Sequence, residues 1–72
     1  MISVKYGIVI EKGEHNCSAF VPDLPGCVAT GATLEGTKER IREAILLHLE
    51  GMREDGDAIP EPTTVCDCVE VA

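Results

Sequence analysis

The stretch from Thr33 to Gly56 most constrains the fold, because it predicts one long amphipathic helix in a short chain. Thr33 is a favourable N-cap residue, and Gly56 suits the left-handed position that follows the last turn of many helices. Between them, side chains of mostly apolar character recur at helical spacing. They are Thr37, Ile41, Ala44, Ile45, His48 and Met52. The sequence therefore predicts a helix over about residues 34–54, whose apolar stripe needs a sheet to cover it.

Four shorter stretches have the period-two alternation and the β-branched residues that are typical of strands. They span about residues 3–11, 17–21, 27–30 and 63–71. A polar connection at 12–16, which contains Gly13, predicts a hairpin between the first two. The expected order is β-β-β-α-β. This is an α+β fold in which one helix packs on an antiparallel sheet, and residues 1–72 form one domain.

Charge and length exclude several classes of function. The chain has 72 residues, of which thirteen are acidic and six basic, so its net charge is −7. A surface this acidic does not bind phosphate backbones. The chain has one Tyr, one Phe and no Trp, so it lacks the aromatic side chains on which nucleic-acid bases stack. No run approaches ~18 apolar residues, and no signal peptide is visible, so we expect a cytoplasmic protein without a membrane span. For a core this small we also expect a covalent staple, a metal or self-association to add stability.

The cysteines lack the spacing of a typical metal site. They are Cys17, Cys27, Cys66 and Cys68. A zinc knuckle places about two to four residues between paired ligands, whereas Cys66 and Cys68 are separated by one residue within a predicted strand. We expect four small buried hydrophobic residues, with a metal site and a redox-sensitive pair as the alternatives. No cofactor is expected.

Catalytic groups are also not predicted. Neither His15 nor His48 has a Cys, Ser or acid at a spacing that suggests a nucleophile and its base. On the predicted strands, the carboxylates of Glu11, Asp67 and Glu70 do not converge as the paired cations of a nuclease require. We therefore do not expect an enzyme.

Two parts of the predicted helix suggest contacts with other proteins. The stretch 45–49 is apolar nearly all round, so Leu46 or Leu49 needs a second cover besides the sheet. That cover is either an oligomer interface or a broad stripe of the same small core. An acidic ridge repeats every four residues and comprises Glu35, Glu39 and Glu43. It is either a solvated face or a docking surface for a basic partner.

Three segments combine into a more specific pattern. They are Ala19–Cys27 (AFVPDLPGC), Thr30–Glu35 (TGATLE) and Ile59–Pro62 (IPEP). Together, they resemble the HicB antitoxin family, and the similarity runs from about Tyr6 to Val71. The Pro-Asp-Leu-Pro-Gly-Cys run, followed within a few residues by Gly-x-Thr, is the most recognisable signature. The resemblance implies a partial RNase-H-like fold without nuclease activity.

The resemblance also implies a partner, a small basic mRNA interferase of the HicA type, which HicB proteins bind and block. The acidity of this chain fits such a partner. We expect inhibition by occlusion, in which the acidic ridge and the loop around Asp23 and Leu24 cover the toxin. The expected toxin-binding residues are Asp23, Leu24, Glu35, Glu39 and Glu43. Fuller family members carry a C-terminal DNA-binding module, and since this sequence ends at Ala72 we expect no direct contact with nucleic acid.

A second interpretation is a stand-alone homo-oligomeric protein-interaction module that has no toxin partner. Both interpretations include a homo-oligomer, a dimer or a tetramer, with Leu46 and Leu49 in its interface. The presence of a neighbouring gene for a small basic toxin would distinguish them.

Overall fold

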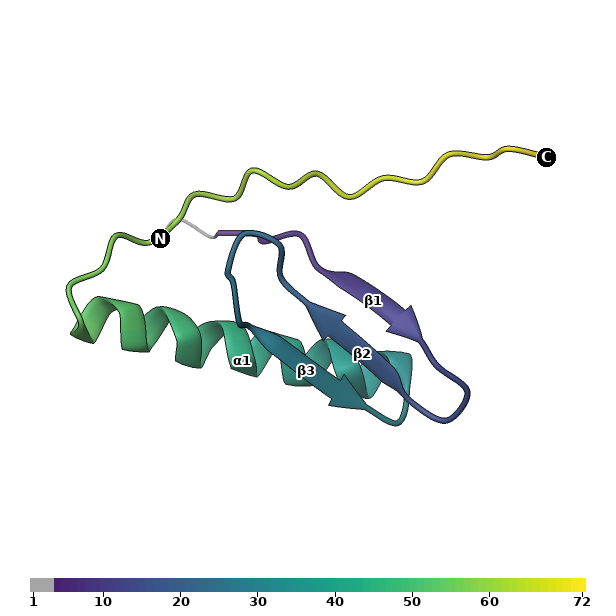
Figure 1. Ribbon diagram of the computed structural model, residues 1–72, viewed down its shortest axis with the longest axis horizontal. Coiled ribbons are helices and arrows are strands. Elements are labelled where there is room, and N and C mark those ends of the chain that lie inside the picture. Colours follow the sequence, from purple (N-terminus) through teal and green to yellow (C-terminus); the bar gives the residue numbers. More distant parts are fainter. Residues whose placement is uncertain (1–3) are drawn as a thin grey trace.

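The computed structural model describes residues 4–72, which form a three-stranded sheet with one helix across one of its faces (Figure 1). Strands β1 (Val9–Lys12), β2 (Cys17–Phe20) and β3 (Val28–Gly31) are antiparallel and lie in the order β1-β2-β3. Helix α1 (Leu34–Glu54) packs on β3 and β2. The α+β class with one helix on an antiparallel sheet is therefore confirmed.

Strand β1 is shorter than the sequence predicts. Its ladder with β2 runs from the Val9–Phe20 pair to the Lys12–Cys17 pair. In this register, the residue opposite Gly7 is Pro22, which has no N–H to donate, so the ladder cannot continue toward the N-terminus. Position 3, the first residue of the predicted strand, lies outside the described residues.

The core lies between the helix-facing side of the sheet and α1. Along β2, buried Cys17 and Ala19 alternate with exposed Ser18 and Phe20, which is the pattern of a strand covered on one face. The buried cluster consists of Ala19, Val21, Leu24, Cys27, Ile41 and Leu49. Tyr6, Ile8 and Ile10 pack against its edge, as the alternation of the first predicted strand indicated.

The start of α1 is held close to the end of β3. The Thr33 side chain accepts a hydrogen bond from the Gly36 N–H at 3.0 Å, which makes Thr33 the N-cap that the sequence predicted. One turn on, the hydroxyl of fully buried Thr37 donates to the Thr33 carbonyl at 2.7 Å. A Cβ at Gly31 would lie 2.6 Å from this hydroxyl oxygen, so only glycine permits the close approach of β3 and α1.

The turn between β2 and β3 is compact and closes over the core. Leu24 N donates to the Val21 carbonyl at 3.1 Å, and Cys27 N donates to the Leu24 carbonyl at 3.0 Å. Gly26 has a φ of 85°, a left-handed conformation that favours glycine. These bonds turn the Leu24 side chain inward, where it is 1% exposed.

The strand predicted at 63–71 does not form. The extended segment, residues 59–72, has no ladder with the sheet and runs past β1 before projecting from the body of the molecule (Figure 1). Pro60 and Pro62 remove two backbone donors at its start. Its valines alternate as in a strand, yet Val65, Val69 and Val71 are more than four-fifths exposed because no sheet edge lies beside them.

Side chains, and not a ladder, attach the beginning of this extended segment to the body. The Asp23 carboxylate accepts hydrogen bonds from the backbone N–H groups of Thr63 and Thr64, both at 3.0 Å. It also accepts bonds from their two hydroxyls, at 2.8 and 3.1 Å. The Tyr6 hydroxyl donates to the Pro60 carbonyl at 2.5 Å. No helix within residues 4–72 is long and apolar enough to cross a membrane.

Candidate protein-docking surfaces

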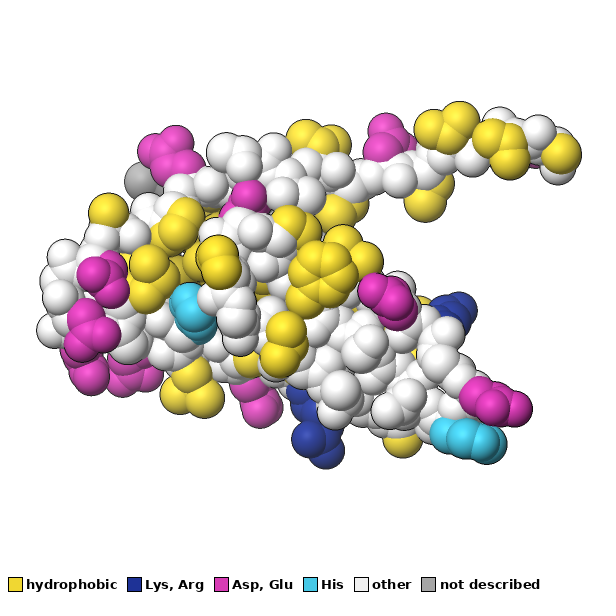
Figure 2. Space-filling view, viewed as in Figure 1, with side chains coloured by type: hydrophobic (Ala, Val, Ile, Leu, Met, Phe, Trp, Pro, Cys, Tyr) yellow, Lys and Arg dark blue, Asp and Glu magenta, His cyan; other side chains and the backbone are white. Residues whose placement is uncertain are grey.

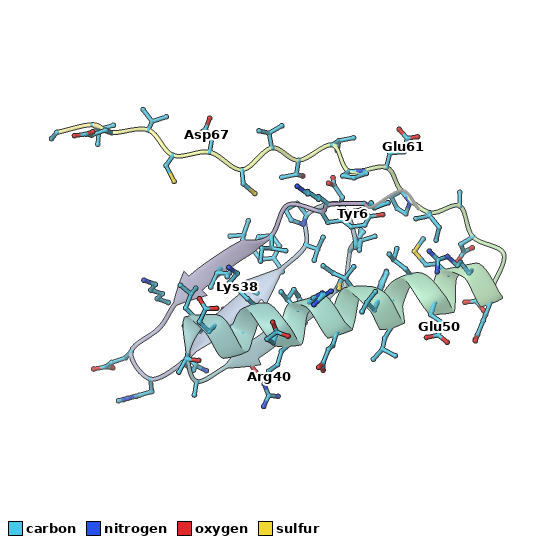
Figure 3. All side chains as sticks on the ribbon, turned by 180° about the vertical axis from the view of Figure 1, so that it is seen from behind. Tyr6, Lys38, Arg40, Glu50, Glu61 and Asp67 are labelled. Carbon is cyan, nitrogen blue, oxygen red and sulfur yellow. The ribbon has the colours of Figure 1, made fainter. Side chains whose placement is uncertain are left out.

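The negative charge is concentrated at one end of the molecule. Residues 50–72 contain seven of the thirteen acidic residues and one of the six basic ones, and so carry −6 of the net charge of −7. We call the part nearest the end of α1 the acidic end. It consists of the exposed residues Glu50, Glu54, Asp55, Asp57 and Glu61. Figure 2 shows acidic side chains gathered where α1 ends, and Figure 3 shows Glu50 and Glu61 pointing away from the body.

The acidic ridge predicted from the sequence is exposed but electrically balanced. Glu35, Glu39 and Glu43 all lie on the surface of α1. Three exposed basic side chains, Lys38, Arg40 and Arg42, are interleaved with them along the same helix. Opposite charges at this spacing partly neutralise one another. The ridge therefore attracts a basic protein less strongly than the acidic end does. A count of charges along the sequence would have located the acidic end.

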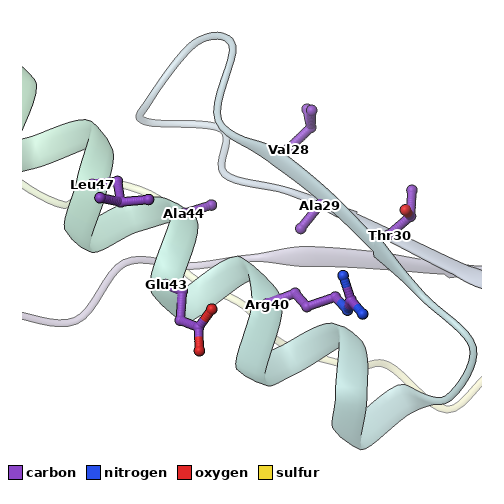
Figure 4. Close-up of a pocket in the computed structure, with 7 residues that line it drawn as sticks. All are labelled: Val28, Ala29, Thr30, Arg40, Glu43, Ala44 and Leu47. Atoms are coloured by element: carbon purple, nitrogen blue, oxygen red, sulfur yellow. The ribbon is translucent and has the colours of Figure 1, made fainter.

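A shallow groove of about 280 Å³ lies between β3 and α1 (Figure 4). We call it the β3–α1 groove. Strand β3 contributes Val28, Ala29 and Thr30, and helix α1 contributes Arg40, Glu43, Ala44 and Leu47. Leu47 is 69% exposed, whereas Val28 borders the groove with its 65% exposed side chain pointing away from α1 (Figure 4). The groove thus combines apolar surface with one positive and one negative charge.

The structure revises the helix residues expected in an oligomer interface. Leu49 is only 9% exposed and belongs to the core, because it continues the row formed by Ile41 and Ile45 at a spacing of four residues. Its assignment to an oligomer interface was therefore wrong. Leu46 is 59% exposed and remains available to a partner. Leu47, which the sequence pattern did not single out, is 69% exposed and lines the β3–α1 groove.

The structure also revises the loop residues expected to touch a toxin. The side chain of Leu24 is buried and cannot serve as a surface contact, so that assignment was wrong. Asp23 is half-buried and directs its carboxylate toward the extended segment. The backbone N–H of Thr64 and the hydroxyl of Thr63 hold the pKa of Asp23 below its usual value, because their hydrogen bonds favour the charged carboxylate.

The four cysteines fall into two pairs with different surroundings. Cys17 and Cys27 are buried, and desolvation raises the pKa of the Cys27 thiol. Cys66 and Cys68 are exposed, so the expectation that all four are buried hydrophobic residues was wrong for this pair. The Cys66 thiol contacts the Ile8 carbonyl oxygen at 3.6 Å, and Cys68 follows it in the extended segment. Among the described residues, no group of three or more His, Cys, Asp or Glu side chains is placed to hold a metal ion.

Comparison with known proteins places the chain in a family. Residues 6–71 match the family described as HicB_like antitoxin of bacterial toxin-antitoxin system. The chain belongs to the HicB-like antitoxin family. Among solved structures, this HicB-like chain resembles a chain of a HicA3 and HicB3 toxin-antitoxin complex, with a TM-score of 0.71 and 28% sequence identity. The match covers 83% of this chain and 70% of that one.

Related sequences come from a phage, an archaeon and a bacterium. A 14.9 kDa protein from the rep-hol intergenic region of Haemophilus phage HP1 is 40% identical over 60 residues. That match covers 83% of this HicB-like chain but 45% of the phage protein, so the chain spans about half the length of that relative. UPF0150 proteins of Archaeoglobus fulgidus and Helicobacter pylori are 44% and 40% identical. The matches cover 78% and 89% of this chain and 86% and 90% of those proteins.

Proposed function

We propose that this HicB-like protein is an antitoxin that binds a small basic HicA-type mRNA interferase and covers its RNA-binding surface. The observation that carries the proposal is the family match over residues 6–71. The likeness to a chain from a HicA3 and HicB3 complex supports a toxin as the partner. On this proposal, the protein acts by occupying a surface and not by catalysis.

The distribution of charge supports the acidic end as the part that meets the toxin first. An excess of one sign at one end of a protein steers an oppositely charged partner toward it and raises the association rate. Glu54, Asp57 and Glu61 are exposed, and residues 54–61 contain no basic residue, since Arg53 precedes them. The acidic ridge adds less, because its basic neighbours partly neutralise it.

The extended segment provides apolar anchors beside these charges. Val65, Val69 and Val71 are exposed, and the acidic Asp67 and Glu70 are interspersed among them in the sequence. An extended chain with free backbone groups and alternating side chains can add to the sheet edge of a partner protein. We therefore assign electrostatic capture to the acidic end and the lifetime of the complex to the valines, since apolar anchors determine dissociation more than surface charges do.

The experiment compares two triple variants that each remove three negative charges. One changes the acidic end (Glu54→Gln, Asp57→Asn, Glu61→Gln), and the matched control changes the ridge (Glu35→Gln, Glu39→Gln, Glu43→Gln). Association with the HicA-type toxin that a neighbouring gene would encode is measured by stopped-flow mixing at low and high salt. We expect the acidic-end variant to lower the association rate at low salt by about tenfold, and the ridge variant to lower it much less.

Two other results would change the proposal. A larger loss from the ridge variant would place the toxin on the ridge that the sequence predicted. If the wild-type protein neither binds the neighbouring toxin nor relieves its toxicity on co-expression, the antitoxin function is refuted. The stand-alone homo-oligomeric module would then be the better interpretation.

A further inference from the structure

We propose that Cys66 and Cys68 form a reversible redox site, at which a low-molecular-weight disulfide oxidises the two exposed thiols to a disulfide within the chain. Closing this disulfide releases the extended segment, from residue 65 onward, from the residues that precede β1. Such control of the segment is separate from toxin binding and does not depend on it.

The two exposed thiols lie on the same side of the extended segment. Side chains of an extended chain alternate between its two sides, so residues 66 and 68 share one side and Asp67 takes the other. Figure 3 shows Asp67 pointing away from the body, while the Cys66 thiol contacts the Ile8 carbonyl oxygen. At about 3.3 Å per residue, the two cysteine Cα atoms are about 6.6 Å apart. That separation lies at the upper end of the usual range for disulfides, about 4.4–6.8 Å, so closure bends the segment slightly.

The two buried cysteines are too far apart to form a competing disulfide. Cys17 lies opposite Gly31 in the β2–β3 register, whereas Cys27 lies opposite Val21, four positions further along β2. The two are therefore separated by about 13 Å along the strands, and a disulfide cannot span that distance. The exposed pair is thus the pair that can close within one molecule.

The sulfur of Cys66 rests in a notch that Gly7 leaves beside the extended segment. A Cβ atom on Gly7 would lie 3.0 Å from the Cys66 Sγ and 3.1 Å from the Thr64 Cγ2, closer than ordinary van der Waals contact. In this notch, the thiol donates a weak hydrogen bond to the Ile8 carbonyl oxygen. A disulfide has no S–H to donate, and its formation turns the sulfur toward Cys68. Oxidation therefore removes this attachment.

A second attachment, which contains no thiol, holds the segment just before the cysteine pair. The Asp23 carboxylate accepts hydrogen bonds from the backbone N–H groups of Thr63 and Thr64, both at 3.0 Å. Oxidation changes none of these groups, so residues 63 and 64 stay in place. The exposed valines of the segment lie beyond this fixed point, and they are the side chains whose positions the redox state controls.

The chemistry consists of two thiol–disulfide exchange steps. One protein thiolate attacks a sulfur of the small disulfide, which forms a mixed disulfide and expels one small thiol. The other protein thiolate then attacks the protein sulfur of the mixed disulfide, which closes the ring and expels the second small thiol. The protein thus loses two hydrogen atoms and two electrons, which the small disulfide gains. Exposed, strained disulfides are the labile ones, so an excess of thiol reverses the reaction.

The first test treats the reduced full chain with bis(2-hydroxyethyl) disulfide, which is uncharged and so is not repelled by Asp67 and Glu70. Remaining thiols are alkylated, and trypsin then releases residues 54–72 as one peptide, since no Lys or Arg follows Arg53. Mass spectrometry should show this peptide without alkyl groups and two hydrogen atoms lighter. At about 10 µM protein, ring closure should exceed covalent dimers by about a hundredfold, because a short linker gives a millimolar effective concentration.

Cys66→Ser and Cys68→Ser are the matched controls, because each variant keeps one exposed thiol. Each should stop at a mixed disulfide with the small thiol, and dithiothreitol should regenerate the free thiols in both variants and in the wild type. The proposal is refuted if the wild type also stops at mixed disulfides, or if it forms covalent dimers in place of the internal disulfide.

The second test compares the reduced and oxidised proteins by NMR. The backbone amide signals of Gly7 and Ile8 should shift on oxidation, because the sulfur leaves the notch. The amide hydrogens of Thr63 and Thr64 are the internal control, and their exchange with solvent should stay as slow as in the reduced protein. Unchanged signals at Gly7 and Ile8 would overturn the release of the segment, and faster exchange at both threonines would refute the fixed point at Asp23.

Discussion

Replacing Leu24 by alanine tests whether the turn between β2 and β3 serves the core or a partner. The side chain is 1% exposed and packs with Val21, Cys27 and the helix-facing cluster. Truncating a buried leucine removes apolar contacts and leaves a cavity, which costs about 2–5 kcal/mol. Domains of this size have a free energy of unfolding of roughly 0.05–0.15 kcal/mol per residue. The loss is therefore a large fraction of the total free energy of unfolding.

Thermal unfolding followed by circular dichroism measures this effect through the signal of α1. In a domain of this length, about 1 kcal/mol corresponds to a shift of roughly 4–8 °C in Tm. A loss of about 3 kcal/mol should therefore lower Tm by roughly 12–24 °C. Toxin binding, measured well below the new Tm, should remain close to that of the wild type, because the side chain does not reach the surface.

Leu47→Ala is the matched control, because it makes the same chemical change at a side chain that is 69% exposed. Its free energy of unfolding, measured at a concentration where the protein is monomeric, should change by no more than about 0.5 kcal/mol. The reasoning fails if Leu24→Ala unfolds like the wild type but loses affinity for the toxin. That result would return Leu24 to the surface role expected from the sequence.

Three further predictions concern other contacts. Because its folded-state pKa lies below the ordinary value of 3.8, the Asp23 carboxylate should stabilise the fold above that pH and stop doing so as the pH falls through the folded-state value. Asp23→Asn should therefore speed amide hydrogen exchange in the segment that Asp23 holds, even at neutral pH. Gly31→Ala would place a Cβ 2.6 Å from the Thr37 hydroxyl and should destabilise the protein by about 1–3 kcal/mol in urea unfolding. In thiol titration, Cys66 and Cys68 should react at once, while the two buried cysteines react only on unfolding; four equally fast thiols would contradict the structure.

The elements that the sequence predicted well are those defined by neighbouring residues. The helix was expected at about 34–54 and occupies Leu34–Glu54, because the Thr33 cap and the residues that end the helix act within one turn. Strands β2 and β3 lie within one residue of their expected bounds, since the alternation along each records which face is covered.

The features that were missed depend on residues distant in the sequence. The segment 63–71 alternates like a strand, but a strand also requires an edge to pair with, and alternation does not indicate whether one lies beside it. Leu24 sits between two prolines in an irregular stretch, where no periodicity predicts burial. Leu49 was different, because its spacing from Ile41 and Ile45 already placed it on the buried stripe. The acidic end could also have been found from the sequence by counting charges segment by segment.

The bond from the Tyr6 hydroxyl to the Pro60 carbonyl gives this protein an internal optical reporter. The chain has one tyrosine and no tryptophan, so its intrinsic fluorescence comes from Tyr6 alone. That ring lies where the residues leading into β1 meet the start of the extended segment. Emission from the unlabelled protein thus reports, without a dye or a mutation, whether this segment stays docked when another protein arrives.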